Sequence, residues 1–273
     1  MKNSWAISAE LARKFQPILR FDRMEIDNPA PCHHVRLRYL DRIGTVISIL
    51  KKHFPDAAAT RIGDFGCAQG NTGLLLAEAG YEVFGTDRNP LFVEYSRWKY
   101  EKSEKSEKGK MHWAVGEIES LPFPPDFLDA AILGEILTTV AHPDRIVKKV
   151  LELLRPGGLL LITVPNAFRL RVRLPTFRQA RSQGNLEALR SDCPAGDHLF
   201  KLLPEELRQI VPRQAGLERS AYCGGTLLIN PYSQWLVRPF PFSWVQALLR
   251  LLARLPLLNR KTFHNRCFVF RKR

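Results

Sequence analysis

The sequence is poor in the features that mark exported, membrane-spanning and zinc-binding proteins. Its five cysteines are scattered and form no C-x-x-C pair. Residues 1–16 contain no apolar segment of signal-peptide length, and no stretch offers the roughly 18 uncharged apolar residues of a membrane span. We therefore expect a cytoplasmic protein that is not exported, does not cross a membrane and holds no metal.

Acidic residues are scarce in the second half of the chain. Residues 1–154 carry 21 Lys and Arg against 21 Asp and Glu, whereas residues 155–273 carry 20 against 6. The net charge of +14 therefore comes from the C-terminal half. This asymmetry favours an anionic partner, which could be a lipid surface, nucleic acid or a phosphorylated substrate. A basic surface kept for solubility is the alternative.

A glycine-rich turn stands within residues 61–90, RIGDFGCAQGNTGLLLAEAGYEVFGTDRNP. The pattern predicts a strand at 61–65, a helix at 72–79 and a second strand at 81–85. Gly66, Gly70 and Gly73 would let the backbone turn sharply and approach a ligand. This order of elements is typical of a nucleotide pocket.

Two carboxylates indicate which nucleotide the pocket would take. Asp87 ends the second strand 21 residues after Gly66, where a carboxylate can accept both hydrogen bonds of a ribose diol. Asp64 stands two residues before Gly66, where it would repel a pyrophosphate but attract the ammonium of an amino-acid cofactor. The strict dinucleotide pattern G-x-G-x-x-G is absent. S-adenosylmethionine is therefore favoured over a dinucleotide.

The turn resembles motif I of the class I S-adenosylmethionine-dependent methyltransferases, acidic-x-Gly-x-Gly-x-Gly. Ala68 replaces the middle glycine, so the turn must keep φ negative there or absorb roughly 1–2 kcal/mol of left-handed strain. The resemblance implies that the cofactor is held by Asp64 and Asp87 together with residues of the turn and the residue after Asp87. Those residues are Gly66, Cys67, Ala68, Gly70 and Arg88.

Three later segments resemble the small-molecule branch of that family, which includes quinone and sugar methyltransferases. GEIESLPF at 116–123 implies that Glu117 contacts adenine and that Ile118 packs on the ring. GEILTTVAHP at 134–143 resembles E-V-L-E-H-V-x-x-P, which places Glu135 in the cleft but puts Thr139 where the family has histidine. LRPGGLLLITVPN at 154–166 resembles the segment that leads into the fifth strand. Continuous apolar runs predict strands at 129–133 and 159–164, with a turn at 155–158 before the second of them.

A candidate general base comes from a fourth segment. HLFKLLPEEL at 198–207 resembles the family segment H-x-x-x-F-x-x-x-E-L, in which the histidine faces the active site. The resemblance therefore implies His198 as the catalytic base.

The predicted fold is α/β, with a Rossmann-like, mostly parallel seven-stranded sheet, helices on both faces and the last two strands antiparallel at the edge. Residues 1–40 are expected to form an N-terminal helical extension, and 41–273 the methyltransferase domain. Within that domain we expect an arginine-rich cap at 167–197 and a helical insertion at 228–261. The insertion is expected to contain one helix over 242–255, which is apolar apart from a thin polar stripe. Residues 235–261 are therefore a candidate membrane-surface contact; packing inside the protein or a dimer is the alternative.

The function expected first is methyl transfer from S-adenosylmethionine to a small-molecule or lipid-linked, anionic acceptor, with oxygen as the methylated atom. An RNA methyltransferase is an alternative that the basic C-terminal half favours, although an aromatic-rich stacking motif is absent. A scaffold protein that keeps the fold without catalysis is a third interpretation, which Ala68 and the missing family histidine allow.

Overall fold

The computed structural model describes residues 9–21, 33–102, 109–170, 173–184, 186–187, 198–226, 232 and 234–273. Its strands are β1 (Arg61–Phe65), β2 (Glu82–Asp87), β3 (Lys110–Val115), β4 (Leu128–Gly134), β5 (Leu154–Pro165), β6 (Ala215–Thr226) and β7 (Phe263–Lys272). Its helices are α1 (Ala9–Phe21), α2 (His33–His53), α3 (Asn71–Glu78), α4 (Pro90–Glu101), α5 (Pro143–Leu153), α6 (Phe177–Ser182), α8 (Pro204–Ile210), α9 (Gln234–Val237), α10 (Phe242–Leu252) and α11 (Pro256–Thr262), with a 3-10 turn at Ile118–Ser120.

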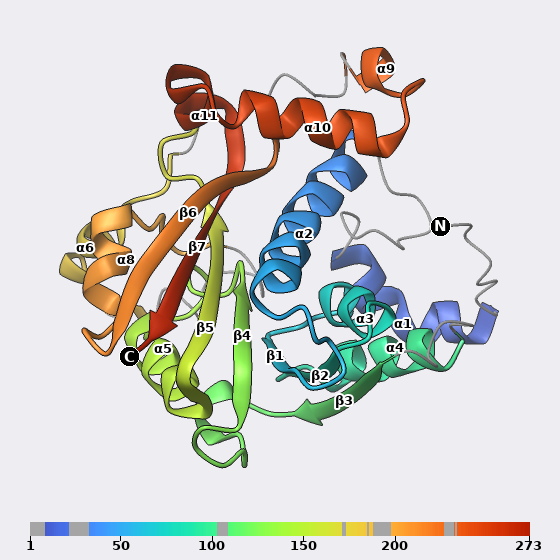
Figure 1. Ribbon diagram of the computed structural model, residues 1–273, viewed down its shortest axis with the longest axis vertical. Coiled ribbons are helices and arrows are strands. Elements are labelled where there is room, and N and C mark those ends of the chain that lie inside the picture. Colours follow the sequence, from blue (N-terminus) through green and yellow to red (C-terminus); the bar gives the residue numbers. More distant parts are fainter. Residues whose placement is uncertain are drawn as a thin grey trace.

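All seven strands form one sheet in the order β3-β2-β1-β4-β5-β7-β6 (Figure 1). The first five strands pair in parallel, whereas β7 runs antiparallel to both β5 and β6. The predicted Rossmann-like sheet with an antiparallel pair at its edge is confirmed. Because the carboxyl ends of parallel strands share one edge, the loops after β1, β2, β4 and β5 meet there.

Helices bury both faces of the sheet. Along β4, Ala130 and Ile132 belong to the core under α2 and α3, whereas Ala131 and Leu133 belong to the core under α5 and α8. Successive side chains of a strand point to opposite faces, so one apolar run serves both cores. This explains why residues 130–133 of β4 are all apolar.

The N-terminal helices cover different parts of the molecule. Helix α1 packs on α4, where the rings of Phe15 and Tyr95 meet edge to face at 4.9 Å. Helix α2 runs unbroken across residue 40 and packs against β6 and β7.

The predicted insertion between β6 and β7 contains α9, α10 and α11. Helix α10 lies across the end of the sheet beside α2 (Figure 1), and its Val245 and Leu249 pack against Leu37 of α2. Within the described residues no helix combines the length and apolarity needed to cross a bilayer.

Strand β5 begins earlier than the sequence predicts. Arg155-Pro156-Gly157-Gly158 was expected to form a turn before a strand at 159–164, but the strand starts at Leu154. Leu154 pairs with Leu128 of β4, and the register shifts before Ala130 pairs with Leu159. Gly157, at φ 79°, allows the irregular backbone that a bulge requires.

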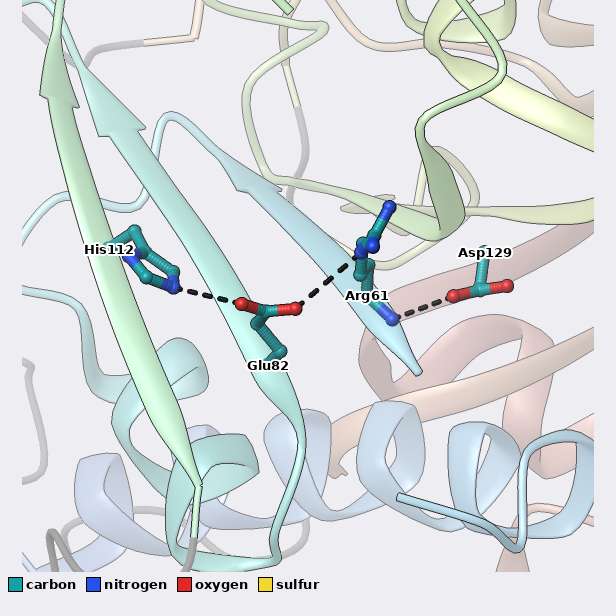
Figure 2. A network of polar contacts seen from close by, with 4 residues as sticks. All are labelled: Arg61, Glu82, His112 and Asp129. Carbon is teal, nitrogen blue, oxygen red and sulfur yellow. Dashed lines mark hydrogen bonds and ion pairs between the residues drawn. The ribbon is translucent and has the colours of Figure 1, made fainter. Parts of the chain in front are cut away.

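A polar network ties the starts of four strands together, away from the carboxyl edge (Figure 2). Glu82 on β2 contacts His112 Nε2 at 3.1 Å and Arg61 Nε at 3.5 Å. The Arg61 backbone N–H donates to Asp129 Oδ2 at 2.7 Å. These side chains therefore stabilise the sheet at the edge opposite the carboxyl ends of the strands.

Candidate functional site

The glycine turn leads directly from β1 into α3, and two of its positions require glycine. Gly66 has φ 68° and Gly70 has φ 73°, both in the left-handed region. A Cβ on Gly66 would lie 2.4 Å from Ile136 Cδ1, and one on Gly70 would lie 1.9 Å from Ser96 Oγ. Only glycine, which has no Cβ, allows the backbone at these two positions to pass this close to Ile136 and Ser96.

Ala68 adopts φ 46°, the left-handed conformation that the family's glycine would take without strain. Of the two outcomes that the sequence left open, the turn takes the strained one, at about 1–2 kcal/mol. Its backbone N–H donates to Asp87 Oδ2 at 2.9 Å. The strained residue thus joins the turn after β1 to the end of β2.

Asp87 and Asp64 lie at the carboxyl ends of neighbouring strands, as the sequence predicted. Asp87 accepts backbone hydrogen bonds from Ala68 and Asn89, each at 2.9 Å. Burial raises the pKa of Asp87 above its ordinary value, although these two bonds and Arg88 act in the opposite direction. Asp64 is buried, and its Oδ2 accepts the Gly73 N–H at 3.1 Å. Both carboxylates are held rigidly by backbone donors.

These residues line a cleft of about 810 Å³ at the carboxyl edge of the sheet. Nearly all the site residues predicted from the sequence contribute to its wall: Asp64, Gly66, Cys67, Ala68, Asp87, Arg88, Glu117, Ile118, Glu135 and His198. Gly70 lies behind the wall, where it caps α3. The volume is in the range of sites for cofactors and small ligands.

The residues expected at adenine form one rim of the cleft. Glu117 and Arg88 make an ion pair at 3.7 Å, with both side chains more than half exposed. Ile118 is buried against the core. Cys67 lies beside them, and burial raises the pKa of its thiol well above the usual value, so it remains protonated. This side of the cleft combines two fixed buried carboxylates, an exposed carboxylate and an apolar floor, which fits an adenosyl group with a cationic amino end.

Glu135 lies toward the other end of the sheet. It follows β4 with φ 62°, and its Oε2 accepts a hydrogen bond from Asn265 of β7 at 2.7 Å. Its Oε1 lies 3.7 Å from Arg42 Nη1 of α2. Since β1, β4 and β5 separate β2 from β7, the Glu135 side chain is tied to elements remote from Asp87. Its predicted role at the cofactor stays a prediction.

His198 is positioned by the segment after β4. Its Nδ1 lies 2.8 Å from Oγ1 of Thr138, a fully buried residue. The backbone N–H of Leu199 also donates to the Thr138 carbonyl at 2.8 Å. These two contacts hold the imidazole ring at the cleft wall. His142, in contrast, is 3.1 Å from Glu187 and does not line the cleft.

Several cleft residues were missed in the sequence. Arg38 and Arg42 of α2 and Asn265 of β7 line the wall, although no motif marks them. Under the glycine turn the fully buried Lys99 donates to Asn71 Oδ1. The only sequence signal for Arg38 and Arg42 was their spacing of four residues, which places both side chains on one face of α2.

The predicted arginine-rich cap is dispersed. Arg169 alone among its described arginines lines the cleft. The others described, Arg173, Arg178 and Arg181, are exposed, and Arg171 and Arg190 lie outside the described residues. Helix α6 packs beside α8, with the Arg178 backbone N–H donating to Glu206 Oε1 at 2.9 Å. The described part of the cap therefore offers the cleft a single arginine.

Residues 63–162 match the family described as a methyltransferase domain. Among the similar proteins, the ubiquinone biosynthesis O-methyltransferase of Dinoroseobacter shibae is 27% identical over 248 residues, which cover 89% of this chain and 92% of that protein. UbiE, the ubiquinone/menaquinone biosynthesis C-methyltransferase of Pseudomonas aeruginosa, is 31% identical over 30% of this chain and 31% of its own length. An uncharacterised 37.1 kDa protein in transposon Tn4556 of Streptomyces fradiae is 29% identical over 53% of this chain. The chain spans 43% of that transposon protein.

Solved structures share the fold at lower identity. The PH0226 protein of Pyrococcus horikoshii OT3 has a TM-score of 0.57 and 14% identity, covering 98% of this chain and 100% of that one. A putative sarcosine dimethylglycine methyltransferase of Galdieria sulphuraria has a TM-score of 0.55 and 14% identity, covering 85% of both chains. With the family match, motif I and the strand order in agreement, the chain belongs to the class I S-adenosylmethionine-dependent methyltransferases, and S-adenosylmethionine is its cofactor.

Proposed function

We propose that the protein methylates an oxygen atom of a small-molecule or lipid-linked acceptor, with His198 as the general base. The supporting observation is that His198, held by Thr138, lines the same cleft as Asp64 and Asp87. S-adenosylmethionine supplies a methyl group that its sulfonium already activates. The protein's task is then to align the acceptor and remove its proton, and such positioning can supply about 7–11 kcal/mol.

The proposed cofactor contacts divide by chemistry. Asp64 would hold the ammonium group and Asp87 the ribose hydroxyls. Glu117 would accept from the adenine amino group, while Ile118 packs on the ring and Arg88 holds Glu117. Gly66, Cys67, Ala68 and Gly70 shape the turn that faces the cofactor.

A base is needed because an alcohol or phenol must lose its proton on methylation, whereas a neutral amine can attack with its lone pair. If Thr138 Oγ1 accepts from His198 Nδ1–H, the lone pair at Nε2 is free to take that proton. This arrangement favours oxygen over a neutral amine as the methylated atom. Among the relatives, one is named as an O-methyltransferase and one as a C-methyltransferase.

Contact with a membrane surface is part of the proposal. The exposed sides of α9, α10 and the residues around them gather large apolar side chains, namely Trp235, Leu236, Phe240, Trp244, Leu248, Leu251 and Leu255. Arg238, Arg250 and Arg254 are exposed in the same segment. Apolar and basic side chains together suit an anionic bilayer. Because α10 packs on α2, which lines the cleft, a lipid-linked acceptor could reach the site from that surface.

The two other interpretations make different predictions. A nucleic-acid methyltransferase would bind RNA with a steep salt dependence, because its basic residues would displace counterions from phosphates. A non-catalytic scaffold would fail to bind S-adenosylmethionine, and the match to the methyltransferase domain family argues against this alternative although Ala68 is strained.

The test is methylation by the whole protein of a panel of simple and prenylated phenols and catechols, with radiolabelled S-adenosylmethionine. We expect label on oxygen, abolished by His198→Ala at unchanged S-adenosylhomocysteine affinity. His142→Ala is the matched control, because that histidine lies outside the cleft wall, and it should stay active. Thr138→Val should lower kcat and shift its pH profile, since it removes the group that positions the ring. Full activity of His198→Ala, or label on carbon, would contradict the proposal.

A further inference from the structure

Charge is segregated within the cleft. The cofactor side contributes three carboxylates, Asp64, Asp87 and Glu117, and one arginine, Arg88, which is paired with Glu117. The side near β6 and β7 contributes three arginines, Arg38, Arg42 and Arg169, and one carboxylate, Glu135. A cofactor with a sulfonium and an ammonium suits the acidic side. The basic side calls for a different ligand.

The three arginines come from two parts of the chain that the fold brings together. Arg38 and Arg42 stand one turn apart on α2, so their side chains leave the helix on the same face. Arg38 passes over β6, where a Cβ added to Gly225 would lie 3.0 Å from Arg38 Cγ. It therefore lies toward the sheet edge that is remote from β2.

Arg169 is held by a turn fastened to β7. The Asn166 side chain donates to the Phe263 carbonyl at 2.9 Å, and its backbone N–H donates to the His264 carbonyl at 2.8 Å. The Arg169 backbone N–H in turn donates to the Asn166 carbonyl at 3.1 Å. The guanidinium of Arg169 is thus presented from a fixed backbone.

Glu135 compensates only part of this charge. Its Oε2 accepts a hydrogen bond from Asn265, whereas its Oε1 lies 3.7 Å from Arg42 and accepts no hydrogen bond within the described residues. The Nε atoms of Arg38 and Arg169 are buried and have no hydrogen-bond partner within the described part of the chain. A buried donor left unpaired is costly, and a guanidinium more so, which makes an external acceptor of hydrogen bonds favourable here.

Arg38 and Arg169 also repel each other. Burial lowers the pKa of Arg38, and the charge of Arg169 lowers it further. Burial lowers the pKa of Arg169 as well, while Glu135 opposes that shift. Two like charges held in a half-buried cleft are stabilised when an anion lies between them.

We infer that the acceptor carries an oxyanion, a carboxylate or a phosphate, which binds between Arg38 and Arg169 while Glu135 holds Arg42 beside it. The planar guanidinium group matches both oxyanions through paired N–H donors. This inference rests on the proposed acceptor site. It names the substrate class and two specificity-determining residues, Arg169 from the predicted cap and Arg38, which no sequence motif indicates.

The experiment is calorimetric titration of the whole protein, saturated with S-adenosylhomocysteine, with benzoate, phenyl phosphate and the neutral benzamide. We expect one of the two anions to bind and benzamide not to bind, and the preferred anion distinguishes carboxylate from phosphate. Arg38→Gln and Arg169→Gln should each weaken anion binding about tenfold or more. Arg181→Gln is the matched control, an exposed arginine outside the cleft wall, and should bind like the wild type.

Three results would overturn the inference. In the first, neither anion binds the wild type. In the second, Arg38→Gln and Arg169→Gln both bind the anion as tightly as the wild type does. In the third, Arg181→Gln loses as much anion affinity as those two variants. If Arg38→Gln and Arg169→Gln instead lose S-adenosylhomocysteine affinity, the arginines hold the cofactor's own carboxylate, which also contradicts it. Should either glutamine variant fail to fold, Arg38→Lys keeps the charge without the planar pair of donors and should show a smaller loss. Failure of the proposed function would appear separately, as turnover in His198→Ala with anion binding intact.

Discussion

The carboxylate of Asp41 on α2 accepts a hydrogen bond of 2.8 Å from the backbone N–H of Gly225 on β6, 184 positions later in the sequence. Asp41 is only 4% exposed, and Gly225 has a left-handed φ of 67°. The contact fastens the helix that carries Arg38 and Arg42 to the edge of the sheet. It therefore sets the geometry of the basic side of the cleft.

Asp41 should make stability depend on pH. Burial raises its pKa to about 6 from 3.8, although the bonds from β6 and the charge of Arg250 oppose the rise. A carboxyl with a raised folded pKa favours the folded state fully at low pH, and this contribution is lost as pH rises through 6. As the pH rises from 4 to 7, we expect the free energy of unfolding of the wild type to fall by about 2–3 kcal/mol relative to that of Asp41→Asn, because asparagine does not titrate.

Urea denaturation of both proteins at the two pH values measures this difference. Asparagine keeps an oxygen that can accept from Gly225, so the variant should fold. A wild-type-to-variant difference that does not change with pH would show that Asp41 is not the titrating group.

Ala68→Gly should stabilise the protein. The substitution removes roughly 1–2 kcal/mol of left-handed strain and costs about 0.4–1 kcal/mol through the greater entropy of the unfolded chain, leaving a gain of up to about 1.6 kcal/mol. The control is Ala79→Gly, because Ala79 has a relaxed φ of −82° and glycine there relieves no strain but adds the entropic cost and removes a partly buried methyl group. Urea denaturation without cofactor should therefore move the two variants in opposite directions. A destabilised Ala68→Gly would refute strain at this position.

The cofactor side of the fold was predictable because its signals are local. Gly66 and Gly70 need their glycines for a turn only a few residues long, and Asp64 and Asp87 close the strands that flank it. Continuous apolar runs predicted β4 and β5, since a strand buried on both faces needs no alternation. The extra residues of β5 escaped prediction because the Leu154–Leu128 pair is made across a bulge.

The basic side of the cleft could not be predicted because its contacts join distant positions. Glu135 and Asn265 are 130 positions apart, and no local pattern links them. Arg38 likewise resembles an ordinary surface arginine until α2, β6 and β7 are placed together, whereas Arg169 belongs to the predicted arginine-rich cap. The insertion was predicted as one helix over 242–255, but α10 ends at Leu252 and Pro256 begins α11. Proline suits a first helical position and cannot continue the helix before it.

Asp87→Asn should weaken binding of S-adenosylmethionine by about 1.5–3 kcal/mol, the range for a lost charged hydrogen bond. Asparagine also turns an amide donor toward the backbone N–H of Ala68 or Asn89, both of which need an acceptor. Because burial raises the pKa of Asp87, its carboxylate takes up a proton at a higher pH than an ordinary aspartate does. As the pH is lowered, the wild type should therefore begin to lose affinity for S-adenosylmethionine at that higher pH. Asp87→Asn should not show this loss. Calorimetry at several pH values tests both statements.

The control for that substitution is Asp126→Asn. Asp126 pairs with Lys272 at 2.8 Å, outside the cleft wall, and its loss should leave cofactor affinity unchanged. Wild-type affinity in Asp87→Asn would remove the ribose assignment.

Trp244→Ser should release the protein from anionic vesicles. Trp244 is 66% exposed on α10, next to the exposed Leu248 and Leu251, whereas Val245 and Leu249 are buried under the same helix. Burying an aromatic side chain contributes about 1.5–3 kcal/mol, so the variant should bind the vesicles about tenfold more weakly, or weaker still. Co-sedimentation with phosphatidylglycerol–phosphatidylcholine vesicles measures this, with Val115→Ser as the matched control. Val115 is 54% exposed on β3 and should bind normally when replaced.

Arg250→Gln and Arg254→Gln separate the electrostatic part of the same interaction. Each basic residue near an anionic surface contributes about 1 kcal/mol, so both variants should bind anionic vesicles less tightly and neutral vesicles unchanged. Added salt should reduce the wild type to the level of these variants, because it screens exposed charges. A different result would contradict the membrane proposal. In that case the wild type does not co-sediment with vesicles, but analytical centrifugation shows a dimer that Trp244→Ser dissociates. The apolar face of α10 would then contact a second copy of the chain.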